Sequence, residues 1–219
     1  MKHTYFFAQH QYLMYVIIFC IIFSGCKKKE TAEEEVAVPV VLAEYHFKAN
    51  INGTDFVYEI KSGNNTNMLS ISDNQNFNGM ELFRFGAEMD ATSAPANLGY
   101  PVVGISFQTL KQLTTDVTDA DFFGFLKKGN YNYLNTFVLG DNGVVVQLVD
   151  RNGNFFYSTD GPQPAATFTV DIATPKAATI GNVAKVKVRA LFNCKVYNAV
   201  GGTLDIKDGE LVIDIENPY

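Results

Sequence analysis

The chain has 219 residues, of which 47% are hydrophobic, 13% aromatic and 18% charged. This composition is typical of a globular protein and excludes a disordered chain, while 17 Gly and 7 Pro exclude a collagen-like filament. The net charge of -6 argues against nucleic-acid binding, because that function needs a basic surface that displaces counterions from phosphates.

Residues 1–25 are predicted to be an export signal and not part of the fold. Lys2 supplies a positive start, and an unbroken apolar run extends from Tyr12 to Phe23. A helix of this length spans about 18 Å, whereas the hydrocarbon core of a bilayer is about 30 Å thick. The alternative, a buried core helix, would end abruptly at Lys27 without a capping residue.

The residues after this run carry a more specific pattern. Phe23-Ser24-Gly25-Cys26 resembles the lipobox of bacterial lipoprotein precursors, in which an apolar residue and two small residues precede a cysteine. Phe23 departs from the aliphatic residue that the family prefers. The resemblance implies cleavage between Gly25 and Cys26, a diacylglycerol on the Cys26 thiol, and an acylated amino group. It therefore implies a lipid anchor in the bacterial cell envelope, most simply at the outer membrane, with the periplasmic or surface face left open.

Residues 26–43 are predicted to be the lipidated cysteine and a charged tether. The string KKKETAEEE favours a solvated stalk, although the three lysines could also contact anionic headgroups. Val36–Leu42 could instead be a first strand, with Pro39 confining it to a sheet edge.

Residues 44–219 are predicted to form one all-β domain. Along Tyr45–Ile51 the residues Tyr45, Phe47, Ala49 and Ile51 alternate with polar ones, as in a half-buried strand. Asn52-Gly53 favours a type I′ turn that leads into Thr54–Ile60. Similar patterns predict further strands at Met68–Ser72, Met80–Phe85, Val102–Phe107, Tyr131–Phe137, Val144–Asp150, Phe155–Ser158, Thr167–Ile172, Val183–Asn193, Lys195–Tyr197, Thr203–Ile206 and Glu210–Ile215.

Turns and one helix complete the expected fold, an antiparallel β-sandwich or open barrel with one short helix. Turns are expected at Arg151–Asn154 and at Asp208-Gly209. The helix should begin at Thr118 or Asp119 and end at a left-handed Gly129.

Histidine and cysteine restrict the chemistry that the mature chain could perform. After removal of the export signal only His46 remains, so a site with several histidines is excluded, and His46 is expected on the exposed side of its strand. Cys194 would be the only free thiol and is interpreted as a small buried hydrophobic residue. No nucleophile elbow, P-loop or dinucleotide fingerprint occurs, so no cofactor is expected.

Three groups of Asp and Asn residues have spacings that calcium ligands could use, and no metal is predicted at any of them. Asp150-x-Asn152-x-Asn154 lacks the glycine and the bidentate glutamate of an EF-hand loop, so a hairpin turn explains it better. Asn74-x-Asn76-x-Asn78 contains no carboxylate. In the remaining string, helix capping accounts for two of the residues Asp116, Asp119 and Asp121.

Tyr131 and Tyr133 are the weak candidates for ligand binding. On one strand they would face the same side, next to Asn130, Asn132 and Asn135, where they could form a sugar or peptide site. Ordinary core packing or cross-strand pairing is the competing interpretation.

As a whole, the precursor resembles small envelope lipoproteins of Gram-negative bacteria, in which a lipobox and charged tether precede a β-sandwich. Such a sandwich opens with a string like the Phe47–Gly53 segment. The expected function is a lipid-anchored, non-catalytic binding or structural module with a glycan or protein ligand and no nucleic acid. The alternative is an envelope glycan hydrolase that uses paired carboxylates.

Overall fold

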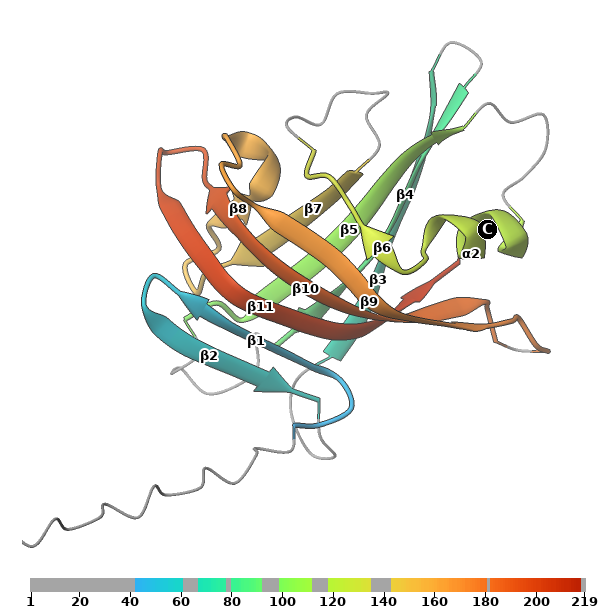
Figure 1. The fold of residues 1–219 in the computed structure, drawn as a ribbon, viewed down its shortest axis with the longest axis horizontal. Helices are drawn as coiled ribbons and strands as arrows, with labels where there is room; N and C mark the ends of the chain where they lie inside the picture. The colour runs from blue at the N-terminus through green and yellow to red at the C-terminus, as the bar shows by residue number, and fades with distance from the viewer. Residues whose placement is uncertain are drawn as a thin grey trace, which may run out of the picture. The chain divides into compact units, whose positions relative to one another are not determined.

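Antiparallel β-strands make up most of the described chain (Figure 1). The computed structural model describes residues 42–60, 67–77, 80–91, 99–111, 118–134, 143–180 and 182–217. The expected export signal and lipobox lie outside these residues, as does most of the tether. The strands are β1 His46–Ile51, β2 Thr54–Glu59, β3 Asn67–Phe77, β4 Met80–Asp90, β5 Val102–Lys111, β6 Gly129–Asn130, β7 Gly143–Val149, β8 Phe155–Tyr157, β9 Thr167–Lys176, β10 Lys185–Tyr197 and β11 Thr203–Glu216.

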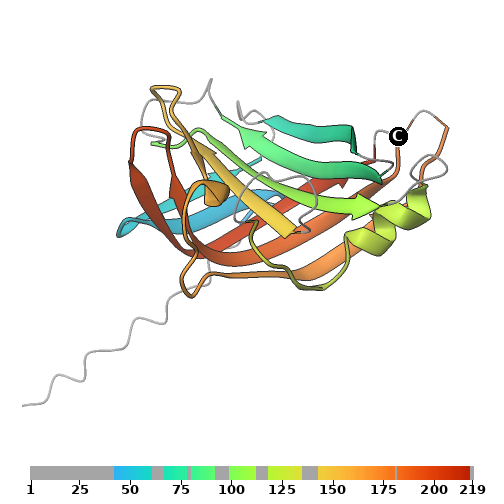
Figure 2. The same cartoon turned by 90° about the horizontal axis from the view of Figure 1, so that it is seen from above.

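The strands form one curled sheet, which confirms the all-β fold class. Their order is β2-β1-β11-β10-β8-β7-β5-β4-β3, and β9 adds to β10 and pairs with β6. Each pairing between these strands is antiparallel. The curl brings β11 into contact with β3 and β4 across the core, and Figure 2 shows the two arms of the sheet facing each other.

The first hairpin turn is confirmed. Asn52 and Gly53 have φ values of 50° and 86°, the left-handed conformations that a type I′ turn requires, and they connect the opposed residues Ile51 and Thr54. The turn at Arg151–Asn154 is confirmed as well, because the Asp150 carbonyl accepts a hydrogen bond from the Gly153 N–H.

Several strands are longer than the sequence predicted, and two expected breaks are wrong. β10 runs without interruption from Lys185 to Tyr197, so the break expected between Asn193 and Lys195 is wrong. β11 likewise runs without interruption from Thr203 to Glu216. Asp208-Gly209 is therefore not a turn but a β-bulge inside β11. The left-handed φ of 51° at Asp208 serves a bulge as well as it would serve a turn.

Helix α2, Asp119–Phe125, begins where the sequence predicted. The Thr118 hydroxyl accepts the Asp121 N–H at 3.3 Å and the Asp121 carboxylate accepts the Thr118 N–H at 3.2 Å, which is a capping box. The expected stop at Gly129 is wrong, because the helix ends at Phe125 and Gly129 begins β6.

Phenylalanine side chains link the strands through the core. Phe47 of β1 stacks on Phe192 of β10 with ring centroids 6.5 Å apart, and Phe168 of β9 lies 5.7 Å from both Phe192 and Phe107. From the helix, Phe122 packs its ring on Phe85 of β4 at 5.1 Å. Burial of each such ring stabilises the fold by about 1.5–3 kcal/mol. The outer face of the sheet therefore lies on a well-packed core.

Candidate functional site

The structure does not place the two tyrosines proposed as ligand-binding residues on one strand. Residues 131–134 contain only an isolated bridge between Tyr133 and Val144, so the strand expected at Tyr131–Phe137 is wrong over these four residues, and residues 135–137 lie outside the described ones. The two rings nevertheless share a neighbour, because both pack edge-on against Phe168.

Both tyrosine hydroxyls already have backbone partners. The Tyr131 hydroxyl lies 2.9 Å and 2.7 Å from the carbonyl oxygens of Phe125 and Lys127, at the end of α2. The Tyr133 hydroxyl faces the Thr167 and Asn193 carbonyl oxygens at 3.2 Å and 3.3 Å, and burial raises its pKa. These contacts agree with the packing interpretation of both residues.

Tyr131 also borders a hollow of about 310 Å³. Asn130 and Asn132 line the same space, as the sequence suggested, but Tyr133 does not. Of the two candidates, only Tyr131 therefore lines one of the hollows found among the described residues.

His46 is buried, which corrects the expectation of an exposed side chain. Its residue exposure is 7%, because Ala43 and Glu210 lie against the ring. The Nδ1–H donates to the Ala43 carbonyl oxygen at 2.8 Å, and Nε2 lies 3.3 Å from a Glu210 carboxylate oxygen. Since Nδ1 must donate to a carbonyl, the contact with Glu210 is a hydrogen bond only when the imidazole carries both protons.

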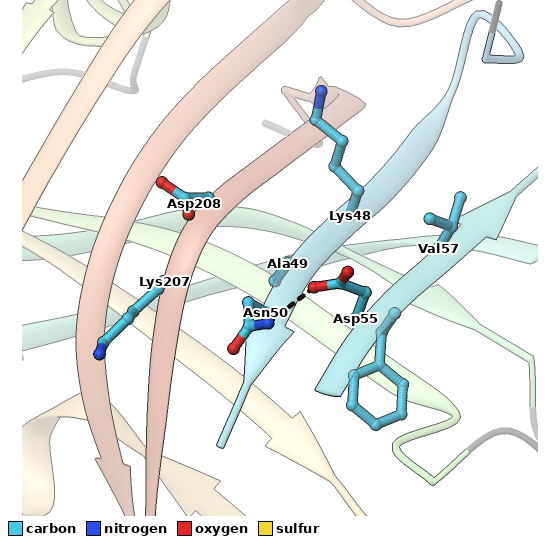
Figure 3. Close-up of a pocket in the computed structure, with 8 residues that line it drawn as sticks. Lys48, Ala49, Asn50, Asp55, Val57, Lys207 and Asp208 are labelled. Atoms are coloured by element: carbon cyan, nitrogen blue, oxygen red, sulfur yellow. Dashed lines mark hydrogen bonds between the residues drawn. The ribbon is translucent and has the colours of Figure 1, made fainter. Parts of the chain in front are cut away.

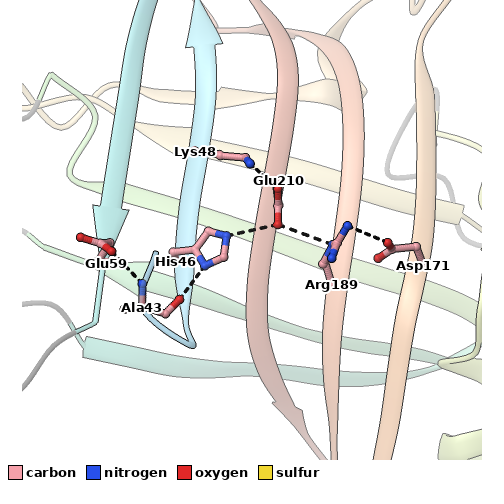
Figure 4. Close-up of polar contacts among 7 residues, drawn as sticks. All are labelled: Ala43, His46, Lys48, Glu59, Asp171, Arg189 and Glu210. Atoms are coloured by element: carbon pink, nitrogen blue, oxygen red, sulfur yellow. Dashed lines mark hydrogen bonds and ion pairs between the residues drawn. The ribbon is translucent and has the colours of Figure 1, made fainter. Parts of the chain in front are cut away.

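Glu210 lies at the centre of a row of charged side chains on the outer face of β1, β11, β10 and β9 (Figure 4). Its carboxylate lies 2.6 Å from Lys48 Nζ, 3.3 Å from His46 Nε2 and 3.5 Å from Arg189 Nε. Arg189 continues the row with a 3.0 Å ion pair to Asp171. Burial acts to raise the pKa of Glu210, but the contacts with Lys48, His46 and Arg189 together hold it below its ordinary value.

A second set of polar contacts lies on the same face, near the start of β1. The Tyr45 hydroxyl donates to the Asp214 carboxylate at 3.1 Å, and Lys185 lies 3.4 Å from the same oxygen. Lys187 pairs with Glu44 at 2.6 Å and lies 4.9 Å from the centre of the Tyr45 ring. Residues 44 and 45, which precede β1, are thus attached to the sheet by side chains of β10 and β11.

The bulge in β11 breaks this charged face and is braced by one side chain. Phe192 pairs with Gly209 and Cys194 pairs with Ile206. Asn193, which lies between them on β10, therefore opposes both Lys207 and Asp208 on β11. The Asn193 Oδ1 accepts the Asp208 N–H at 2.9 Å, while its Nδ2 donates to the Thr167 hydroxyl on β9 at 3.1 Å. The bulge therefore has a defined geometry although it lies on the surface.

Three hollows meet at Asp208, and we call them the Asp208 hollows. The first, of about 360 Å³, lies between β11 and the β1–β2 hairpin, where Asn50 donates to Asp55 at 2.7 Å (Figure 3). The second, of about 420 Å³, is lined by Lys48, Glu210 and Thr167, and the third, of about 320 Å³, lies beyond the bulge. All three include Asp208 among their lining residues.

The Asp208 carboxylate has no hydrogen bond or ion pair to any residue in the described part of the chain. The other carboxylates on this face, Glu210, Asp171 and Asp214, each have a cation within 4 Å. An acceptor without a partner, beside these hollows, can accept hydrogen bonds from a ligand. Sequence reasoning missed this residue because Asp-Gly signals a positive φ without showing whether a turn or a bulge uses it.

The remaining polar candidates have structural partners or lie outside the description. The Asp150 carboxylate accepts hydrogen bonds from the Asn152 and Asn154 N–H groups, and Asp119 accepts one from Asn217. Asp116 and the side chains of Asn74, Asn76 and Asn78 are outside the described residues. Within the described ranges, no group of three or more His, Cys, Asp or Glu side chains is placed to hold a metal ion.

Among the described residues, no helix has the length and apolar character needed to cross a bilayer. No family model, curated protein or solved structure matches the chain.

Proposed function

We propose that this protein is a lipid-anchored lipoprotein of the bacterial cell envelope whose β-domain is a non-catalytic binding module. The lipobox resemblance at Cys26 supports the anchor. The observation that carries the binding function is the convergence of three hollows on Asp208, whose carboxylate has no described partner. The ligand is a glycan or a protein.

The residues around Asp208 favour a ligand rich in hydroxyl or amide groups. Asp208 offers acceptors, Thr167 offers a hydroxyl, and Lys48 and Lys207 provide ammonium groups at the border of the same surface. Such a mixture matches the alternating donors and acceptors of a sugar or of an extended backbone.

Preorganisation also supports a binding surface. Asn193 connects β9, β10 and β11 through the Thr167 hydroxyl and the Asp208 N–H, so the bulge does not have to be ordered when a ligand arrives. A surface that is already ordered loses less conformational entropy on binding, and more of the interaction energy appears as affinity.

The binding test compares the purified full chain with Asp208→Asn on an array of bacterial surface glycans and peptidoglycan fragments. We expect wild-type binding that falls about tenfold in Asp208→Asn, equivalent to about 1.4 kcal/mol. Asp160→Asn is the matched control, because Asp160 is exposed and borders none of the Asp208 hollows. Equal binding by wild type and Asp208→Asn would contradict the assignment of this surface.

A second candidate function is glycan hydrolysis, and one observation favours it. Glu88 and Asp90 lie two residues apart on β4, so their side chains project to the same face. Burial and the nearby charge of Asp90 raise the pKa of Glu88, which is the property of a general acid. Release of reducing ends by wild type but not by Glu88→Gln would favour this function over the binding module.

A further inference from the structure

Phe155 is an unusual surface residue. The residue is 51% exposed, and every other aromatic residue whose burial is described is buried or only partly exposed. The next residue, Phe156, points the other way into the core and is 7% exposed. Because side chains alternate along a strand, Phe155 and Tyr157 project from the same outer face of β8.

The two outer rings are aligned with each other. The planes of Phe155 and Tyr157 differ by 9°, and their centroids are 6.1 Å apart. Among the described residues, most other aromatic contacts are edge-on. The two parallel rings are therefore stacked on each other with an offset, and Phe155 is the more exposed of the two at the surface.

Polar residues border the pair along one row of the sheet. Gln147 of β7 lies opposite Tyr157, Gly104 of β5 lies opposite Gln147, and Glu88 of β4 lies opposite Gly104. Gly104 carries no side chain, and a Cβ there would lie 3.0 Å from the Glu88 Cβ. The row thus begins at the Tyr157 ring, continues with the Gln147 amide and ends at the Glu88 carboxylate.

The segments on both sides of β8 hold the pair in place. Before the strand, the Asp150 carboxylate accepts hydrogen bonds from the N–H groups of Asn152 and Asn154. After it, Gln163 donates to the Ser158 carbonyl oxygen and so fixes the 3₁₀ turn η1, Ser158–Asp160. A platform held in this way is ordered before a ligand binds.

We propose that Phe155 and Tyr157 form a stacking platform for the pyranose rings of an oligosaccharide, with Gln147 and Glu88 bonding its hydroxyl groups. The face of an aromatic ring carries negative charge density and attracts the polarised C–H groups on the apolar face of a sugar. The amide and the carboxylate suit the hydroxyl groups at the rim of the same sugar. A protein partner fits less well, because stable protein interfaces bury about 800 Å² per partner, and this exposed aromatic surface is small and borders polar groups.

The platform is separate from the Asp208 hollows, since none of its residues lines them. The inference therefore goes beyond the binding surface proposed above, and each site can be tested without the other.

The absence of tryptophan from the chain provides a direct test. Phe155→Trp in the detergent-solubilised full chain places the only tryptophan on the platform. We expect its emission to shift and to saturate on titration with at least one of cellohexaose, xylohexaose, mannohexaose, maltohexaose and chitohexaose. Failure of all of these probes to change the emission would overturn the proposal.

Substitutions distinguish stacking from a general apolar contact. By isothermal titration with the responding hexasaccharide, Phe155→Leu and Tyr157→Leu should each bind at least about tenfold more weakly than wild type, equivalent to about 1.4 kcal/mol. Phe155→Tyr keeps the ring and should bind as wild type does. Ile172→Ala removes an apolar side chain that is 37% exposed on β9 and should have no effect.

Two results would overturn the proposal at this stage. Unchanged affinity in Phe155→Leu would show that the ring is not needed. A loss in Asp208→Asn as large as that in Phe155→Leu would show that the sugar binds at the hollows and not on a separate platform. Wild-type affinity in Asp208→Asn supports the platform.

Discussion

Phe192 occupies the space that a side chain at Gly209 would need. A Cβ on Gly209 would lie 2.8 Å from two carbons of the Phe192 ring and 2.9 Å from the Phe192 carbonyl oxygen. The two residues are opposed across β10 and β11, directly beside the bulge at Asp208. The absence of a side chain at 209 thus allows a core ring to pack beneath the proposed binding surface.

Gly209→Ala should therefore destabilise the domain. Both the ring and the backbone would have to move to admit a methyl group, and overpacking of this kind costs about 1–3 kcal/mol. Urea unfolding of the purified chain measures the change in the free energy of unfolding. Gly124→Ala is the matched control, because a Cβ there meets no atom within 4 Å and Gly124 lies inside α2. The control should be neutral or more stable by up to about 1 kcal/mol, and an equally neutral Gly209→Ala would contradict the packing argument.

His46→Ala should also destabilise the domain, by about 1–2 kcal/mol. The substitution removes a buried ring, leaves the Ala43 carbonyl without its donor and takes one partner from Glu210. Lys176→Ala, at an exposed position of β9, should change the free energy of unfolding by less than about 0.5 kcal/mol. A His46 variant as stable as this control would show that the buried contacts contribute nothing.

Glu210 should make stability depend on pH in the acid range. Burial opposes its ionisation, but Lys48, His46 and Arg189 hold its pKa below the ordinary value of 4.5. A depressed pKa stabilises the fold above the unfolded-state value, and this contribution is lost as the pH falls through the folded-state value.

The measurement compares wild type with Glu210→Gln at pH 7 and at pH 3. Wild type should be more stable at pH 7 by about 1 kcal/mol or less, since the network is partly exposed, and the difference should shrink at pH 3. Lys48→Met should remove part of the same pH dependence. A difference between wild type and Glu210→Gln that is constant from pH 7 to pH 3 would show that Glu210 does not contribute through ionisation.

Cys194 should be unreactive while the domain is folded. The thiol is free and 4% exposed, and burial raises its pKa to about 12 although Tyr133 opposes this shift. Since the thiolate is the reactive form, iodoacetamide at pH 8 should label Cys194 only after unfolding in urea. The melting temperature should also be the same with and without reductant. Rapid labelling of Cys194 itself in the native chain would contradict this burial.

Cys26→Ser tests the anchor. In a Gram-negative host, the resemblance to a lipobox predicts that wild type incorporates labelled palmitate and that Cys26→Ser remains an unlabelled, uncleaved precursor. Serine cannot form the thioether that carries the diacylglycerol. Cys20→Ser is the control and should be labelled as wild type is. Label on the Cys26→Ser variant would exclude the lipobox interpretation.

Local features of the fold could be predicted from the sequence because they depend on neighbouring residues. The left-handed pair Asn52-Gly53 forms its turn from backbone preferences alone, and Thr118 caps α2 through groups three residues away. Alternating hydrophobicity predicted the strands for the same reason, since period two follows from the geometry of one extended chain. The resemblance to a lipobox at Phe23–Cys26 is also contained in four adjacent residues, and it stays a prediction.

The candidate sites were decided by distant parts of the chain. His46 has a polar neighbour pattern, yet it is buried because Glu210, 164 residues away, lies against its ring. The left-handed conformation at Asp208 became a bulge and not a turn because β10 continues past it through Asn193 and pairs on both sides. The outer rings of Phe155 and Tyr157 lie beside Gln147 and in line with Glu88 only because β8, β7, β5 and β4 are adjacent in this register. Local backbone preference specified which conformations each segment could adopt, whereas pairing between distant strands determined which side chains meet.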